Sequence, residues 1–187
     1  MPWSESTPTK TRVITIILVL GLFAGGVAAF IDTGGPEAVE PGKTSVRWFA
    51  FDEGFSLAKQ TNRKLLIDVY TDWCSWCKKM DKEVYTDPRV QEVLQARFVP
   101  VKLDAESSRE LTLNNRTLSE SRLAQEMGVT GYPTTVFFDS NVQFITKVAG
   151  YVESAQFARI LRFIGEDHYR SKTFEEFLSI EDASDSQ

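Results

Sequence analysis

The chain has little of what metal sites and nucleic-acid surfaces require. Its 187 residues include two cysteines and one histidine, whereas a structural zinc site usually takes about four protein ligands. The histidine, His168, lies far along the chain from both cysteines. The net charge is −5 and the globular part has no basic cluster, which argues against nucleic acid as a partner. We therefore expect no metal, no other cofactor and no nucleic-acid partner.

Only one long apolar run is present, and it lies near the N-terminus. Residues 13–31 (VITIILVLGLFAGGVAAFI) carry no charge and are just long enough to span a bilayer as a helix. Lys10 and Arg12 precede the run and acidic residues follow it, so the positive-inside rule leaves residues 1–12 in the cytoplasm. This predicts a single-pass protein of the cell membrane with an extracytoplasmic (periplasmic) C-terminal domain. The alternative is a signal peptide cleaved before Phe30 and a secreted domain.

The rest of the chain predicts one domain between two polar segments, without internal repeats. Residues 32–44 are rich in Gly, Pro and Glu, as in flexible linkers. Residues 181–187 (EDASDSQ) predict a disordered tail. Residues 45–180 remain as the domain, and their pattern predicts the order β-α-β-α-β-α-β-β-α. That order indicates an α/β fold with a mixed central sheet and helices on both faces.

Local patterns place the main strands. Residues 64–70 (KLLIDVY) are apolar on both faces, as buried central strands are. Residues 134–139 and 143–149 predict a hairpin. Two stretches are less regular. Residues 46–51 predict a first strand or an extended segment before a helix capped by Asp52, and the polar residues 105–118 predict a loop.

Both cysteines lie in one motif, residues 73–78 (WCSWCK). Two thiols at this spacing are typical of a reversible intramolecular disulfide. A helix predicted over residues 78–85 follows the strand, so Cys74 lies where free N–H groups and the helix dipole stabilise a thiolate. Cys77 follows one turn later. A structural disulfide, half of a zinc site and inert core cysteines are the alternatives.

Two charged residues and two tryptophans stand out near this motif. Asp68 lies inside an apolar strand, where desolvation would raise its pKa; an exposed position on an edge strand is the alternative. Lys102, in a Val/Leu-rich strand, has the same ambiguity. Trp73 and Trp76 indicate a substrate-contacting surface and core packing rather than a cofactor site.

With these residues in view, the chain resembles the thioredoxin superfamily over residues 51–164. The resemblance depends on Asp68, the motif at residues 73–78, Lys102 and residues 128–134 (GVTGYPT). Within the superfamily the chain is most similar to extracytoplasmic thiol:disulfide interchange proteins and to the soluble C-terminal domain of the membrane disulfide reductases. The resemblance implies a thioredoxin-like fold.

The resemblance also implies a role for each matching residue. Cys74 is then the attacking thiolate and Cys77 resolves the mixed disulfide. Asp68 matches the buried carboxylate that accepts or relays the proton of the resolving cysteine, and Lys102 matches the lysine facing it. Pro133 matches the cis-proline beside the dithiol; the backbone of the residue before it, Tyr132, would pair with an extended substrate segment.

The function that follows is a thiol:disulfide oxidoreductase that reduces disulfides of client proteins. It would need electrons from a transmembrane donor, because its compartment is oxidising. The dipeptide Ser75-Trp76 departs from the Gly-Pro of cytosolic thioredoxins and leaves the direction of electron flow open. A disulfide oxidase or isomerase is one alternative. A copper-handling or chaperone-like binding module is another.

Overall fold

The computed structural model describes residues 45–113 and 115–184. The cytoplasmic segment, the anchor or signal and the linker, predicted over residues 1–12, 13–31 and 32–44, lie outside the described residues. Within the described part of the chain, no helix is both long and apolar enough to cross a membrane.

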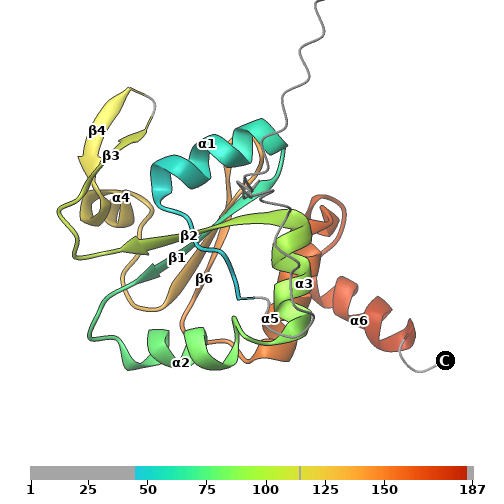
Figure 1. The fold of residues 1–187 in the computed structure, drawn as a ribbon. Helices are drawn as coiled ribbons and strands as arrows, with labels where there is room; N and C mark the ends of the chain where they lie inside the picture. The colour runs from blue at the N-terminus through green and yellow to red at the C-terminus, as the bar shows by residue number, and fades with distance from the viewer. Residues whose placement is uncertain (1–44, 114, 185–187) are drawn as a thin grey trace, which may run out of the picture. The chain divides into compact units, whose positions relative to one another are not determined.

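A four-stranded mixed sheet forms the centre of the domain, in the order β2-β1-β5-β6 (Figure 1). Its central strand β1 (Lys64–Tyr70) runs parallel to β2 (Phe98–Asp104) and antiparallel to β5 (Thr134–Phe138). Strand β6 (Phe144–Ala149) pairs antiparallel with β5 at the edge. The predicted central strand, the hairpin and the mixed sheet are thus confirmed.

Helices cover both faces of this sheet. Helices α1 (Phe51–Thr61) and α4 (Glu120–Glu126) contribute to one apolar core, and α2 (Ser75–Glu83), α3 (Pro88–Arg97) and α5 (Ser154–Gly165) contribute to the other. Alternate residues of a strand point to opposite faces. In β1, Leu65, Ile67 and Val69 therefore enter the first core, whereas Leu66 enters the second.

The start of the domain differs from the prediction. Residues 46–51 form no strand; Phe49 makes a single isolated bridge to Val101. Helix α1 begins at Phe51, whose side chain is buried, and its N-cap is Ala50. Asp52 consequently lies in the first turn and is not the cap; instead, its carboxylate accepts a hydrogen bond from the backbone N–H of Thr112, at 2.8 Å.

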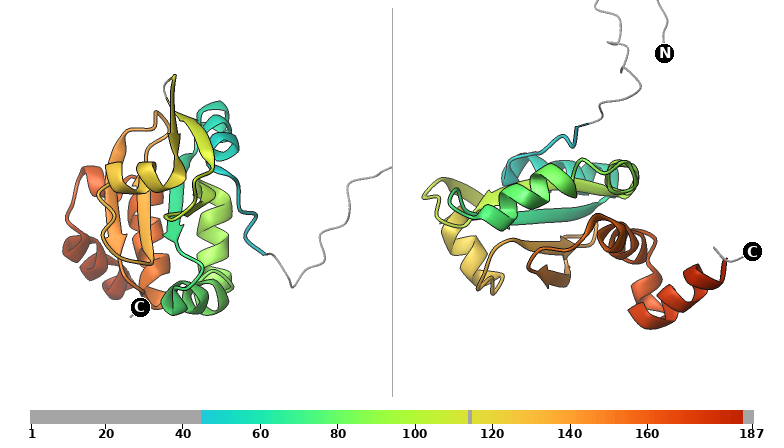
Figure 2. Two further views of the ribbon diagram at one scale, coloured as in Figure 1. Left: turned by 90° about the vertical axis from the view of Figure 1, so that its left-hand side faces the viewer. Right: turned by 90° about the horizontal axis from the view of Figure 1, so that it is seen from below.

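The segment predicted as a loop over residues 105–118 contains a hairpin. Strands β3 (Glu110–Leu113) and β4 (Arg116–Ser119) form a separate two-stranded sheet. Leu111 and Leu118 are directly opposite in this hairpin and both are buried in the first core. Their burial gives the hairpin an apolar side. The prediction of a loop followed from the mostly polar composition of the segment. The hairpin and the C-terminal helix lie at opposite sides of the sheet (Figures 1 and 2).

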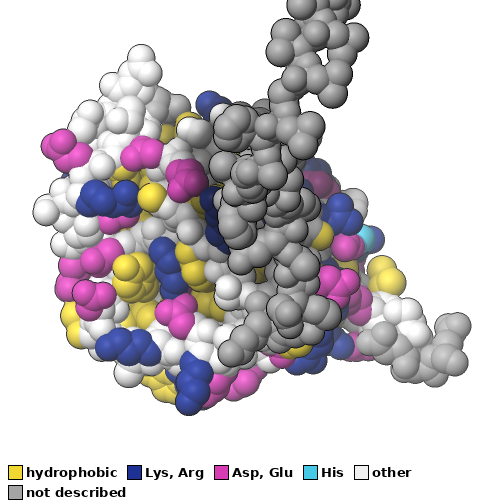
Figure 3. Space-filling model, viewed as in Figure 1, with side chains coloured by type: hydrophobic (Ala, Val, Ile, Leu, Met, Phe, Trp, Pro, Cys, Tyr) yellow, Lys and Arg dark blue, Asp and Glu magenta, His cyan; other side chains and the backbone are white. Residues whose placement is uncertain are grey.

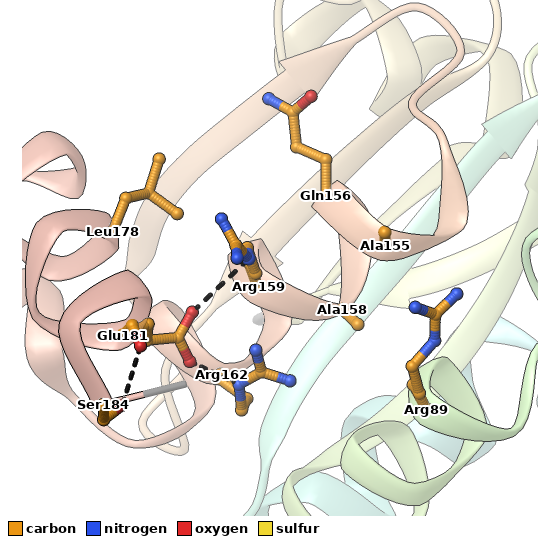
Figure 4. Close-up of a pocket in the computed structure, with 9 residues that line it drawn as sticks. All are labelled: Arg89, Ala155, Gln156, Ala158, Arg159, Arg162, Leu178, Glu181 and Ser184. Atoms are coloured by element: carbon orange, nitrogen blue, oxygen red, sulfur yellow. Dashed lines mark hydrogen bonds and ion pairs between the residues drawn. The ribbon is translucent and has the colours of Figure 1, made fainter. Parts of the chain in front are cut away.

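Residues 181–184 are helical, whereas the prediction placed them in a disordered tail. Helix α6 (Phe174–Ser184) continues through the first part of the predicted tail, residues 181–187. The Glu181 carboxylate accepts a hydrogen bond from Arg162 at 2.7 Å, and Asp182 accepts one from Arg159 at 2.6 Å. These contacts lie beside a pocket of about 830 Å³ between α5 and α6 (Figure 4). Ion pairs with two arginines of α5 thus stabilise the helical position of Glu181 and Asp182, although the composition of this segment is polar.

Candidate active site at the cysteine pair

The two cysteines lie at the N-terminus of α2 and form a disulfide. Their Cα atoms are 5.3 Å apart, and both side chains are buried. Cys74 is the N-cap of α2, and its sulfur accepts a hydrogen bond from the backbone N–H of Cys77 at 3.0 Å. After reduction, the same N–H and the helix dipole would stabilise a thiolate on Cys74. The predicted placement of Cys74 at a strand–helix junction is confirmed.

Trp73 is exposed next to the disulfide and is held from two sides. Its side chain is 65% exposed. The indole N–H donates a hydrogen bond to the Glu106 carboxylate at 2.9 Å. The ring meets the Tyr132 ring edge-on, with centroids 5.9 Å apart. Trp73 is therefore a fixed aromatic surface beside Cys74.

Trp76, between the two cysteines, is 53% exposed, so it is not the core residue that one interpretation allowed. Its ring packs against Tyr151 with centroids 5.4 Å apart. The Lys79 ammonium lies 5.2 Å from the Trp76 ring centroid and 4.6 Å from that of Tyr151. The Tyr151 hydroxyl donates a hydrogen bond to Glu83 at 3.1 Å. These contacts fix the first turns of α2, which lack the proline of cytosolic thioredoxins.

The Tyr132–Pro133 peptide bond is cis, and Pro133 is buried. The Pro133 carbonyl accepts a hydrogen bond from the backbone N–H of Gly150 at 2.8 Å, which joins the start of β5 to the end of β6. In the described part of the chain, the backbone of Tyr132 itself makes no backbone hydrogen bond.

Asp68 and Lys102 are neighbours across β1 and β2, where they occupy the same register. The Lys102 ammonium donates a hydrogen bond to Asp68 Oδ2 at 2.5 Å and a second one to Asp81 on α2. Asp68 is buried in the central strand, not exposed at an edge.

Burial raises the pKa of Asp68, and the attraction of Lys102 offsets this only in part. For Lys102, burial acts to lower the pKa, but the two carboxylates, Asp68 and Asp81, raise it overall. The arrangement is a buried base of raised proton affinity beside a lysine that stays charged.

Sequence reasoning missed the partners of the tryptophans and of Lys102. Glu106, Tyr151 and Asp81 are contributed by other segments or by a later turn of α2. No local motif marks them.

Among residues 45–113 and 115–184, no group of three or more His, Cys, Asp or Glu side chains is placed to hold a metal ion. On the face seen in Figure 3, acidic and basic side chains are interspersed.

Known proteins are similar to this chain in sequence. The thiol:disulfide interchange protein DsbD of Tatumella citrea is 34% identical over 109 residues, and that of Actinobacillus pleuropneumoniae is 32% identical over 103 residues. These matches cover 57% and 54% of this chain but only 17% and 16% of the relatives. The chain thus spans a small part of the length of these curated relatives.

Solved structures give the same fold. A thioredoxin from Thermus thermophilus is 27% identical with a TM-score of 0.54, over 65% of this chain and 88% of that one. A thioredoxin-fold protein from Helicobacter pylori is 24% identical with a TM-score of 0.55, over 65% and 80%. The family described as a thioredoxin-like domain matches residues 51–165, well over half of the chain. This protein therefore belongs to the thioredoxin-like domain family.

Proposed function

We propose that this protein is an extracytoplasmic thiol:disulfide oxidoreductase that reduces disulfides in client proteins. The observation that carries the proposal is the Cys74–Cys77 disulfide at the N-terminus of α2, in a domain whose central strand buries Asp68 against Lys102. The printed name of the curated relatives, thiol:disulfide interchange protein, supports the same chemistry.

The reaction follows from the positions of the two sulfur atoms. In the reduced protein, the Cys74 thiolate attacks one sulfur of a client disulfide; the client S–S bond breaks and one client thiolate leaves. The Cys77 thiol then gives its proton to the Asp68 carboxylate and attacks Cys74 Sγ. The bond between Cys74 and the client breaks, and the second client thiolate leaves. Two electrons pass to the client, and the protein reaches the disulfide form.

The surface around Cys74 supports binding of an extended client segment. The free backbone groups of Tyr132, next to the cis bond to Pro133, would pair with that segment as a strand does. Trp73 and Trp76 would contact the client side chains on either side of the reacting sulfur, because aromatic side chains offer large contact area at low cost in conformational entropy.

The proposal also includes a membrane anchor and a source of electrons. Residues 13–31 would anchor the chain in the cell membrane, with the domain on the periplasmic side. Because a reductant in an oxidising compartment must itself be reduced again, a transmembrane electron donor is the expected second partner.

Trapping of clients tests the roles of the two cysteines. Cys77→Ser removes the resolving thiol, so mixed disulfides with clients should accumulate on Cys74. The matched variant Cys74→Ser keeps one thiol at the same helix terminus and should trap none. Non-reducing gels of the full-length protein from cells would show both results. Equal trapping by the two variants would contradict the assignment.

The reduction potential of the Cys74–Cys77 couple tests the direction. The paired Asp68 and Lys102 match the reductant type, so we expect a value near that of thioredoxin, about −270 mV. Equilibration in dithiothreitol or glutathione buffers, followed by the fluorescence of Trp73 and Trp76, gives the value. A potential above about −180 mV would favour an oxidase or isomerase. Tight binding of Cu(I) with no turnover of disulfide substrates would favour the copper-handling module.

A further inference from the structure

Tyr85 is a buried polar residue for which the chemistry above gives no role. It follows the end of α2 and is 3% exposed. Its ring meets those of Trp48 and Phe157 edge-on, at centroid distances of 4.7 and 5.7 Å. Among the described residues, its hydroxyl makes no hydrogen bond of ordinary geometry, but the side chains of Thr135 and Asp68 lie close enough to act on its pKa through hydrogen bonding. A buried tyrosine hydroxyl usually has a hydrogen-bond partner, because an unpaired buried polar group is costly.

A second unpaired polar atom lies in the same part of the core. Lys102 donates a hydrogen bond to Oδ2 of Asp68, whereas Oδ1 is buried and makes no hydrogen bond of ordinary geometry among the described residues. The Tyr85 side chain nevertheless lies close enough to act on the pKa of this carboxyl through hydrogen bonding. The Lys102 ammonium, 2.5 Å from Asp68 Oδ2, lies 5.5 Å from the Tyr85 ring centroid. One unpaired atom is a hydroxyl donor and the other a carboxylate acceptor, so the two are complementary.

The charges around the pair determine which group changes its protonation state. Burial raises the pKa of Tyr85 well above its usual value, and the Asp68 charge adds to this, so the hydroxyl keeps its proton. The Lys102 ammonium contacts Asp68 and Asp81 and lies over the rings of Trp48 and Tyr70, at 4.7 and 5.1 Å. Both contacts favour its charged form. Asp68 is then the group that gains and loses a proton.

Solvent reaches this cluster from the side of β2. A cavity of about 300 Å³ is lined by Trp48, Asp81, Tyr85 and Lys102, together with residues of the segments before α1 and around the start of α3. This volume is enough for several water molecules. Tyr85 therefore stands between a water-accessible cavity and the buried carboxylate.

We propose that Tyr85 is a positioning residue in thiol–disulfide interchange: its hydroxyl donates a hydrogen bond to Oδ1 of Asp68 and stabilises the carboxylate that accepts the Cys77 proton. This inference rests on the proposed function and names a further residue for it. A hydrogen bond to the charged form lowers the pKa of a carboxyl group. Loss of the hydroxyl therefore leaves Asp68 protonated, and unable to act as a base, up to a higher pH.

Tyr85→Phe tests this role, because it keeps the ring and removes only the hydroxyl. Stopped-flow measurement of mixed-disulfide resolution on the full-length protein should show the pH profile moved to higher pH. Below the midpoint the rate should fall about three- to tenfold, whereas the plateau at high pH stays the same. Tyr169→Phe is the matched control, remote from the cysteines, and should keep the wild-type profile. A Tyr85→Phe profile equal to that of the control would overturn the proposal.

A second measurement needs no change at Tyr85. In protein labelled with ¹³C at tyrosine Cζ, the Tyr85 signal should follow the protonation of Asp68 as pH changes. Asp68→Asn should abolish that response, and a Tyr85 signal with no response in the wild-type protein would overturn the proposal. Failure of Cys77→Ser to trap clients would refute the proposed function but would not change this titration. The two results are therefore distinguishable.

Discussion

The Asp68 carboxyl should contribute less to the stability of the folded domain at neutral pH than at acid pH. Asp68→Asn should remove this pH-dependent contribution. Burial raises the pKa of this carboxyl in the folded protein above its value of about 3.9 in an unfolded chain. Between these two pKa values the folded state binds the proton and the unfolded state does not. The contribution of Asp68 to stability is therefore fully present below about pH 4 and is lost as pH rises through the folded pKa.

The size of the effect follows from the same elevation of the pKa. Each unit of elevation corresponds to about 1.4 kcal/mol of unfolding free energy lost once Asp68 is ionised. The raised pKa of Asp68 already includes the opposing attraction of Lys102. When Asp68 is replaced by Asn, the Lys102 ammonium still has Asp81 as an ion-pair partner. We therefore expect the unfolding free energy of Asp68→Asn, minus that of the wild type, to increase between pH 4 and pH 8.

Urea unfolding of the oxidised protein at several pH values measures this difference. The comparison with the variant is essential, because other carboxyls act in the opposite sense. Asp87, for example, is bound by Arg89, which holds its pKa well below the usual range, so its contribution is lost as pH falls. Subtraction cancels such groups. Parallel stability curves for Asp68→Asn and wild type would refute the reasoning that burial dominates at Asp68.

Three further substitutions give separate tests of the fold and the site. Gly54→Ala should lower stability by about 1–3 kcal/mol, since a Cβ there would lie 2.2 Å from Val101 Cγ2; an unchanged melting temperature would contradict this. Phe177→Ala should release α6 from the rings of Phe163 and His168, seen as faster proteolysis after residue 165; equal protection would show that ion pairs suffice. Trp76→Ala should raise KM for a disulfide-containing peptide more than it changes kcat, and a pure kcat effect would place Trp76 outside client binding.

Local sequence signals predicted the parts of the fold that depend on neighbouring residues. Asp87 caps α3 and Pro88 opens it, in the positions that these residue types prefer at a helix start. Thr173 and Glu176 exchange the two hydrogen bonds of a capping box at the start of α6. The position of Cys74 followed from the junction of an apolar strand with a helix. In each case the signal lies within a few residues of the feature.

Contacts between distant segments could not be predicted in the same way. Tyr151 reaches Trp76 because the end of β6 is joined to the start of β5 by the Gly150–Pro133 hydrogen bond. The β3–β4 hairpin is stabilised by burial of Leu111 against the first core, whereas its own composition is polar. Sequence periodicity reports which residues are apolar, but it does not report which surface they meet.

The pairing of β1 also determines when the site can exist during synthesis. Asp68 lies between two partners: Lys102 on β2 and Thr135 on β5. A nascent chain that ends before Tyr132 already contains both cysteines, but it lacks β5, the strand that pairs with β1 beside Asp68. Such a chain has a pair of thiols but not the buried carboxylate of the finished domain. The complete redox centre is thus a property of the finished domain. It does not exist while the chain is still being made.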